Sequence, residues 1–183
     1  MRTTVFCGIS LDGFIARSDG TIDFLESFDP AVTPEGTPDD LGFGDLVASV
    51  DAMVMGRNTF DFVADSGFDW PYGDLPVIVL TNRPLELPAG LDEVVETASV
   101  EPAELLAVLS SRFVEHVYLD GGFVVQSFLR AGLVDELILT TVPMLVGQGI
   151  PLFGSLEHDQ RFALVESRAA SNGFVQSRYH REP

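Results

Sequence analysis

The chain contains no lysine, so all ten of its basic residues are arginines. Twenty-eight acidic residues outnumber them, and the formal net charge at pH 7 is −18. A surface of this sign repels the phosphate backbone of nucleic acids, so we expect no nucleic-acid partner. A phosphate-binding loop of the Walker type requires lysine and is therefore excluded.

Cysteine is nearly absent, and long apolar runs are missing. The single residue Cys7 cannot form a disulfide within the chain; a small core side chain is the simpler interpretation and a catalytic thiol the alternative. The apolar run before Ser10 is too short for a signal peptide, and no stretch reaches the roughly 18 residues of a membrane span. We therefore expect a cytoplasmic protein with no membrane partner.

Motifs of several catalytic classes are also missing. The three histidines lack zinc-ligand spacing, so we expect no metal site and predict surface or packing roles for His116, His158 and His180. The Gly-x-Gly pairs that begin at Gly42 and Gly147 lack the third glycine of a dinucleotide fingerprint. There is no Gly-x-Ser-x-Gly nucleophile motif.

The chain does have enough apolar residues for a large core, since 46% of its 183 residues are hydrophobic. This length fits one domain covering residues 1–183. Apolar runs predict strands at residues 3–9, 14–16, 52–55, 76–80, 94–95, 117–119 and 136–142. Residues 45–50 are predicted to end a short helix, and further helices are predicted at 56–64, 101–112 and 122–131, followed by a hairpin of 162–167 and 173–179. This order predicts an α/β fold with a mainly parallel central sheet, an antiparallel C-terminal edge and helices on both faces.

Three loops at predicted strand ends are candidate ligand sites, because ligands gather at the carboxyl ends of parallel strands. They are residues 56–59, 81–83 and 120–122. Gly121 and Gly122 allow close approach of the backbone, and the N-terminus of the helix that follows suits a pyrophosphate. A tight turn without ligand is the alternative.

Arg57 and Arg83 strengthen the prediction of a phosphate site. A guanidinium binds phosphate through two parallel hydrogen bonds and stays charged. The hydroxyls of Thr59 and Thr81 could add donors. The alternative is that each arginine pairs with one of the plentiful surface carboxylates.

Taken in order, these segments resemble the dihydrofolate-reductase superfamily. They are closest to the C-terminal reductase domain of the bifunctional riboflavin-biosynthesis deaminase/reductase. The matching segments are SLDGFIA at 10–16, VDAMVMGRNTF at 50–60, DGG at 120–122, GLVDEL at 132–137, and 143–153. The resemblance implies a three-layer dihydrofolate-reductase-like fold. It also implies an NADPH-dependent reductase that transfers a hydride to a small heterocyclic or carbonyl/imine substrate.

The resemblance also implies where NADPH would bind. The residues that would flank the adenosine phosphate are Gly56, Arg57, Asn58, Thr59, Thr81, Asn82 and Arg83. Gly121 and Gly122 would meet the pyrophosphate, with Phe123 and Val124 beginning the helix. Gly8, Ile15 and Ala16 would lie beside the nicotinamide.

On the substrate side, the resemblance points to Asp40 and Thr140 as candidate catalytic residues. For Asp40 the preferred interpretation is a solvated loop acid, because Gly42 and Gly44 disfavour the helix that would carry it. The riboflavin branch typically has a lysine near the end of its first strand, where this chain has Cys7 and Gly8. The acids expected at the mouth are Glu35, Asp39, Asp40 and Asp45. Such a mouth favours an uncharged or cationic small substrate over a phosphorylated one.

Two alternatives remain at this stage. The chain could be a non-catalytic nucleotide-binding protein on the same fold, or a true dihydrofolate reductase. By analogy with the riboflavin branch we also expect a homodimer. The apolar stretch 137–146 could supply the shared face or be buried within one subunit.

Overall fold

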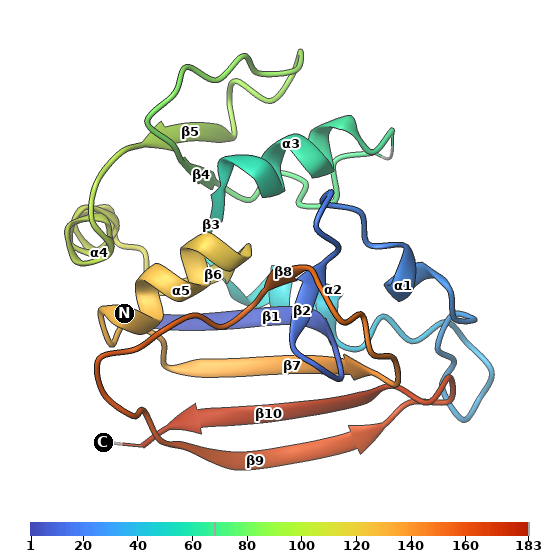
Figure 1. The fold of residues 1–183 in the computed structure, drawn as a ribbon. Coiled ribbons are helices and arrows are strands. Elements are labelled where there is room, and N and C mark those ends of the chain that lie inside the picture. Colours follow the sequence, from blue (N-terminus) through green and yellow to red (C-terminus); the bar gives the residue numbers. More distant parts are fainter. Residues whose placement is uncertain (68, 183) are drawn as a thin grey trace.

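The computed structural model describes residues 1–67 and 69–182 of the chain (Figure 1). The strands are β1 (Arg2–Ser10), β2 (Phe14–Ala16), β3 (Ala52–Gly56), β4 (Val77–Leu80), β5 (Val95–Ala98), β6 (His116–Asp120), β7 (Glu136–Val142), β8 (Ile150–Pro151), β9 (Phe162–Ala169) and β10 (Val175–Arg181). The helices are α1 (Asp23–Glu26), α2 (Phe43–Ser49), α3 (Arg57–Asp65), α4 (Pro102–Ser111) and α5 (Gly122–Arg130).

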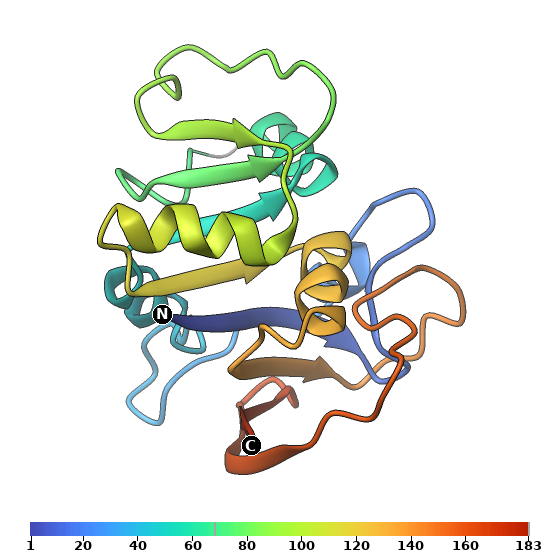
Figure 2. The same ribbon diagram turned by 90° about the vertical axis from the view of Figure 1, so that its left-hand side faces the viewer.

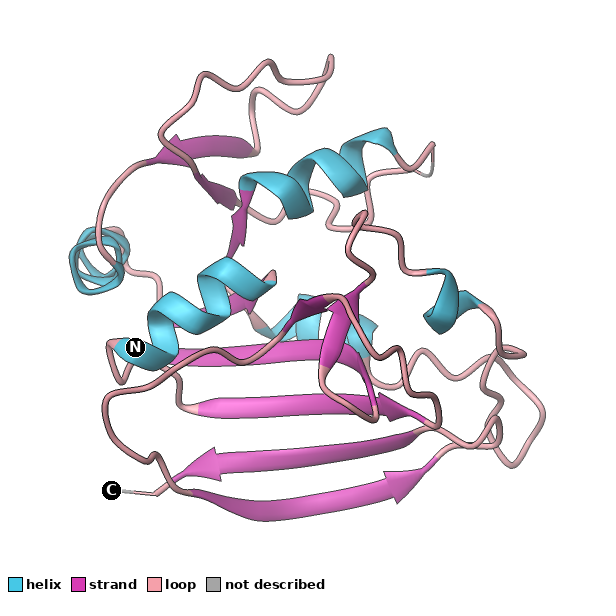
Figure 3. Cartoon of the chain, viewed as in Figure 1, coloured by secondary structure: helices cyan, strands magenta, loops and turns pink. Residues whose placement is uncertain are grey.

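Eight strands form the main sheet, in the order β5-β4-β3-β6-β1-β7-β10-β9 (Figure 3). The pairs from β5 across to β7 are parallel, and β10 pairs antiparallel with both β7 and β9. The predicted mainly parallel sheet with an antiparallel C-terminal edge is therefore confirmed. Its central strands are the most apolar, and every residue of β3 is buried.

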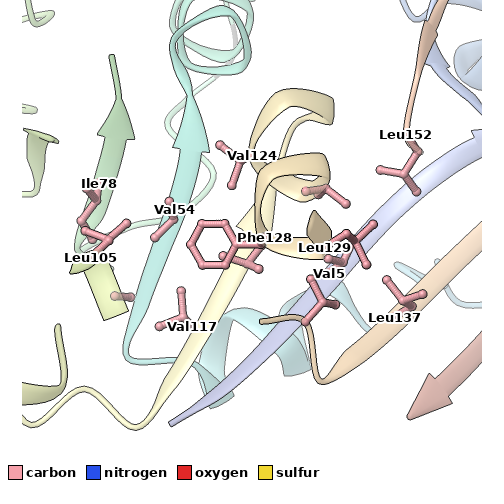
Figure 4. Close-up of a cluster of buried hydrophobic side chains, with 14 of the residues drawn as sticks. Val5, Val54, Ile78, Leu105, Val117, Val124, Phe128, Leu129, Leu137 and Leu152 are labelled. Carbon is pink, nitrogen blue, oxygen red and sulfur yellow. The ribbon is translucent and has the colours of Figure 1, made fainter. Parts of the chain in front are cut away.

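Helices cover both faces of this sheet and complete three layers (Figure 2). On one face, Phe128 of α5 is fully buried with Val5 of β1 and Val54 of β3 (Figure 4). On the other face, Leu46 of α2 and Phe60 of α3 join a second buried cluster. Neighbouring residues along β3 alternate between the two clusters, as side chains on successive strand residues must.

Three elements differ from the sequence-based expectation. The short helix α1 and the two-residue strand β8, which pairs with β2, were not predicted. Helix α2 begins at Phe43 and includes Gly44, so it starts earlier than predicted, whereas Asp40 lies outside it, as expected from Gly42 and Gly44. Asp40 explains the difference: its Oδ2 accepts a hydrogen bond from Gly44 N at 2.8 Å. A Cβ on Gly44 would lie only 2.9 Å from that oxygen, so glycine allows this cap.

The stretch 137–146 is partly buried within the subunit. Strand β7 lies inside the sheet between β1 and β10, and Leu137, Leu139 and Val142 are buried within the subunit. Leu145 of the same stretch is 72% exposed, so both alternatives for this stretch stay open. The homodimer itself stays a prediction. No helix in the described part of the chain is long and apolar enough to cross a membrane.

Candidate functional site

The carboxyl ends of β3 and β6 bring two helix N-termini together. These strands are parallel neighbours, and Met55 pairs with Asp120 near their ends. Helix α3 begins directly after β3, and α5 begins two residues after Asp120. Neither helix has a side-chain cap, because glycine precedes each first turn. Their first N–H groups therefore lie outside the helical bonding pattern, an arrangement that suits an anion.

Gly121 is required by the contact between the two helices. Its φ is 86°, in the region that favours glycine. A Cβ at this position would overlap the Oγ1 atom of Thr59 in α3. The first backbone hydrogen bond of α5 runs from Val125 N to Gly121 O at 3.0 Å. The glycine thus lets α5 start beside α3 with its unpaired N–H groups at the sheet edge.

Gly122 makes a close approach to another part of the protein. An added Cβ would lie 2.9 Å from the carbonyl oxygen of Pro151 and 3.3 Å from Ile15 Cδ1. Ile15 and Ala16 belong to β2, and Pro151 belongs to β8. The structure therefore brings the predicted nicotinamide-side residues of β2 against the first turn of α5.

Asp120 is the carboxylate at the centre of this edge. Burial raises the pKa of its side chain to about 6, although a hydrogen bond from Gly121 N at 2.7 Å lowers it in part. It forms no ion pair within residues 1–67 and 69–182. A carboxyl group of this kind can hold or release a proton near neutral pH. Sequence reasoning gave it no role, although its position just before the glycine pair was the available signal.

Cys7 lies near Asp120 and behaves as a core residue. Burial, and secondarily the charge of Asp120, raise the pKa of its thiol. The thiol donates a weak hydrogen bond to Gly8 O at 3.4 Å and packs against the main buried cluster. A raised pKa disfavours the thiolate, so the structural interpretation is preferred to a catalytic thiol.

The loops after β3 and β4 are also adjacent, as predicted, because these strands are parallel neighbours. Arg57 Nη1 donates to Pro84 O at 2.7 Å and so joins them directly. Its Nε is held by both oxygens of Asp61, at 2.6 and 2.8 Å. Arg57 thus already has a carboxylate partner, which was the alternative considered for it.

Arg83 differs from Arg57, because its side chain has no ion pair with any described residue. Its backbone N donates to Thr81 Oγ1 at 3.1 Å, which shapes the turn after β4. Arg83, Asn82 and Asn58 are all exposed. Arg83 is therefore the cation at this edge that is freest to meet an incoming phosphate.

Gly8 and Thr140 face each other on β1 and β7. Helix α1 covers this point, since a Cβ on Gly8 would lie 3.3 Å from Leu25 Cδ2. The side chain of Thr140 is 6% exposed and accepts a hydrogen bond from Gln176 Nε2 at 3.1 Å. Leu25, not a basic residue, therefore lies over Gly8.

Asp40 has a local structural task. It is exposed, and its two oxygens accept hydrogen bonds from Gly42 N at 2.9 Å and Gly44 N at 2.8 Å. No hydrogen bond joins it to Thr140 within the described chain. The two are linked only indirectly, because Gln176 Nε2 also donates to Leu41 O at 2.8 Å. This geometry favours the interpretation of Asp40 as a loop acid.

A second carboxylate at the same edge, Asp12, fastens two loops to each other. It accepts hydrogen bonds from Ser10 Oγ at 2.6 Å, Val146 N at 3.1 Å and Gly147 N at 2.7 Å. The Ser10 bond and these backbone bonds lower the pKa of Asp12 to about 2. No group of His, Cys, Asp and Glu among the described residues could hold a metal ion.

Comparison with known proteins identifies the family. The model of the RibD C-terminal domain matches residues 3–176. The chain belongs to the RibD C-terminal domain family. This membership confirms the resemblance stated from the sequence. The chain is therefore similar to the reductase domain of riboflavin biosynthesis.

Several relatives support this assignment. The uncharacterized Bacillus subtilis (strain 168) protein YwjB is 32% identical over 164 residues, covering 89% of this chain and 88% of that protein. A Shewanella sp. PV-4 protein, provisionally named a riboflavin biosynthesis protein, is 38% identical, with a TM-score of 0.91 over the full length of both chains. Acinetobacter baumannii RibD shares the fold at 21% identity and a TM-score of 0.70, and this chain covers 58% of it.

Proposed function

We propose that this chain is an NADPH-dependent reductase that transfers a hydride to a small heterocyclic or carbonyl/imine substrate. The observation that carries the proposal is the meeting of two uncapped helix N-termini at Gly121, beside the buried carboxyl group of Asp120. The RibD family membership supports the reductase class.

The residues present fit a dinucleotide. The N–H groups at the start of α5 suit its pyrophosphate, and Gly121 keeps side-chain atoms away from that position. Arg83 is exposed on the neighbouring loop and suits an additional phosphate on the adenosine ribose. When bound, the nicotinamide supplies the hydride, while the protein supplies binding and orientation.

Asp120 suits the proton chemistry of such a reduction. Its pKa of about 6 allows a population of protonated carboxyl groups near neutral pH. Leu25 covers Gly8, near the point where the riboflavin branch typically has a lysine. We therefore propose an uncharged or cationic substrate, as the acidic composition also favours.

A non-catalytic nucleotide-binding protein is the second candidate. The observation in its favour is that the oxygens of Asp40 already cap α2, so the carboxylate expected from dihydrofolate reductases is occupied. The same observation disfavours a true dihydrofolate reductase. Asp120 supports the reductase over a simple binder, since binding alone needs no carboxyl group with a raised pKa.

Thermal unfolding with added nucleotides tests the proposal. We expect NADPH to raise the melting temperature more than NADH at equal concentration, because Arg83 can meet the extra phosphate. Absorbance of the reduced nicotinamide, followed with pterins, flavins and pyrimidines, then tests turnover. Equal shifts with the two nucleotides would contradict the phosphate assignment. Stabilisation by NADPH without oxidation by any acceptor would favour the binding protein.

A further inference from the structure

A cavity of about 360 Å³ lies on the face of the sheet that α2 borders, away from the candidate cofactor site. Strands β1, β7, β9 and β10 form its base, and α2 forms one wall. No residue of 56–59, 81–83 or 120–124 lines it. Its volume falls in the range of pockets that hold small organic ligands. We call it the arginine cavity, after Arg2, Arg168 and Arg178 in its lining.

The base of the arginine cavity carries an excess of positive charge. Glu136 is 1% exposed and accepts hydrogen bonds from Thr4 Oγ1 at 2.8 Å and Arg2 Nη2 at 2.6 Å. Arg178 Nε donates to its other oxygen. Two guanidinium groups thus share one buried carboxylate. This arrangement is unexpected in a chain whose acids outnumber its bases 28 to 10.

Both guanidinium groups keep donors that this carboxylate does not use. Arg2 reaches Glu136 through Nη2 and Arg178 through Nε, which leaves two nitrogens on each group. Their side chains are 46% and 40% exposed, so these nitrogens can reach a ligand. Arg168, by contrast, is held by both oxygens of Asp39 and by Gln176.

The other charged groups around the arginine cavity do not cancel this excess at its base. Asp45 of α2 and Glu166 of β9, which lies opposite Arg178, also line the cavity, but neither forms an ion pair with its arginines within the described chain. His116 lies beneath, with Nε2 2.8 Å from Thr4 Oγ1 and Nδ1 3.0 Å from Ser49 O. His180 lies 3.0 Å from Glu136 Oε1 and adds a further donor when protonated.

Apolar side chains complete the arginine cavity. Phe6 and Ile138 come from the sheet, and Leu46 comes from α2. A ligand that fits must therefore present an anionic group to Arg2 and Arg178 and an apolar body to these side chains. We propose that the arginine cavity binds a small organic anion with a compact apolar body, such as an aromatic carboxylate, at a site separate from the cofactor edge.

Benzoate is a suitable probe, with benzamide as its neutral analogue. We expect NMR titration of the ¹⁵N-labelled protein to show benzoate-dependent shifts at Arg2, Ile138 and Arg178, with at least tenfold weaker binding of benzamide. Equal affinity for the two probes would overturn the proposal. Shifts confined to residues 121–124 would also overturn it, because the anion would then occupy the helix N-terminus.

Matched charge variants separate the arginine cavity from the net charge of the protein. We expect Arg2→Gln to weaken benzoate binding at least tenfold, while Arg178 still holds Glu136. Arg112→Gln removes the same charge from an exposed pair with Glu96 and should leave the affinity unchanged. Equal effects of the two variants would contradict a local site. Thermal unfolding checks that each variant is folded.

Filling the arginine cavity gives an independent test that changes no charge. Ile138→Phe adds volume to the apolar wall and should reduce benzoate binding severalfold in a protein that still unfolds cooperatively. Unchanged affinity in this variant would contradict the placement. Sedimentation with and without benzoate identifies a competing occupant. If binding is lost on self-association at high protein concentration, a second copy fills the cavity and the ligand proposal is wrong.

Discussion

Two carboxylates at opposite edges of the same sheet have opposite electrostatic surroundings. Asp120 ends β6 at the carboxyl edge, without a cationic partner among the described residues, and burial raises its pKa to about 6. Glu136 begins β7 at the amino edge. Burial opposes its charge, yet hydrogen bonds from Arg178 and Thr4 and the charge of Arg2 lower its pKa to about 2. Removing a buried acid that is held by cations destabilises the fold, whereas a buried acid without a cationic partner is a candidate for proton chemistry.

The amino edge should show the larger effect on stability. We expect Glu136→Gln to lower the free energy of unfolding by about 2–4 kcal/mol, because two charge-assisted hydrogen bonds are lost while Arg2 and Arg178 stay partly solvated. Urea unfolding of this variant and of Glu93→Gln, an exposed acid, measures the effect. A loss no larger than that of the control would contradict the contrast between the edges.

Acid sensitivity gives the same contrast in the unmodified protein. The pKa of Glu136 is lower in the native state than its ordinary value of 4.5. Its contribution to stability is therefore present above about pH 4.5 and lost as the pH falls through about 2. Glu136→Gln should lack this component of acid unfolding.

Asp120 should behave in the opposite way. Its native pKa lies above the ordinary value of 3.8, so stability is fully present below that pH and lost as the pH rises through about 6. We expect Asp120→Asn to be more stable than the parent by up to about 3 kcal/mol at pH 8 and equal to it below pH 4. Urea unfolding across this pH range tests it, with Asp92→Asn on an exposed loop as control. A variant that is less stable at pH 8 would mean that Asp120 is a structural acid like Glu136.

Arg83 and Arg57, both at the carboxyl edge, differ in their carboxylate partners. Arg83 lacks a carboxylate partner in the described chain, whereas Arg57 is held by Asp61. We expect Arg83→Gln to weaken NADPH binding roughly tenfold or more and to leave NADH binding unchanged. Calorimetry with both nucleotides measures this, with Arg112→Gln as the charge-matched control. Equal losses for the two nucleotides would place Arg83 away from the extra phosphate.

Substitution of Asp12 should have the smallest effect, confined to the two loops it joins. Its carboxylate accepts hydrogen bonds only from Ser10 Oγ and backbone N–H groups. Asp12→Asn removes the Oδ2 acceptor of Gly147 N and keeps an oxygen for Val146 N. We expect hydrogen exchange to accelerate more at Gly147 than at Val146. Asp19→Asn, in a separate turn, should change neither amide. Equal acceleration at both would mean that the whole loop has detached.

Much of the fold could be predicted from the sequence, because apolar runs and glycine positions act locally. The bounds of β7 and the start of α5 at the glycine pair follow from such patterns. The site was harder to predict from the sequence, since its chemistry depends on residues that are distant along the chain. The raised pKa of Asp120 results from burial by several strands, and the pairing of Arg57 depends on Asp61 one helical turn away. Asp40 was misleading for a similar reason, because its cap on Gly44 is visible only in three dimensions.

The carboxyl edge is the centre of the proposed function, and amide NMR shifts on titration with NADPH test it most directly. We predict the largest shifts at residues 56–59, 81–83 and 120–124, with smaller ones at Arg2 and Arg178. Absence of binding, or shifts centred on the arginine cavity, would contradict the assignment of the two helix N-termini as a dinucleotide site.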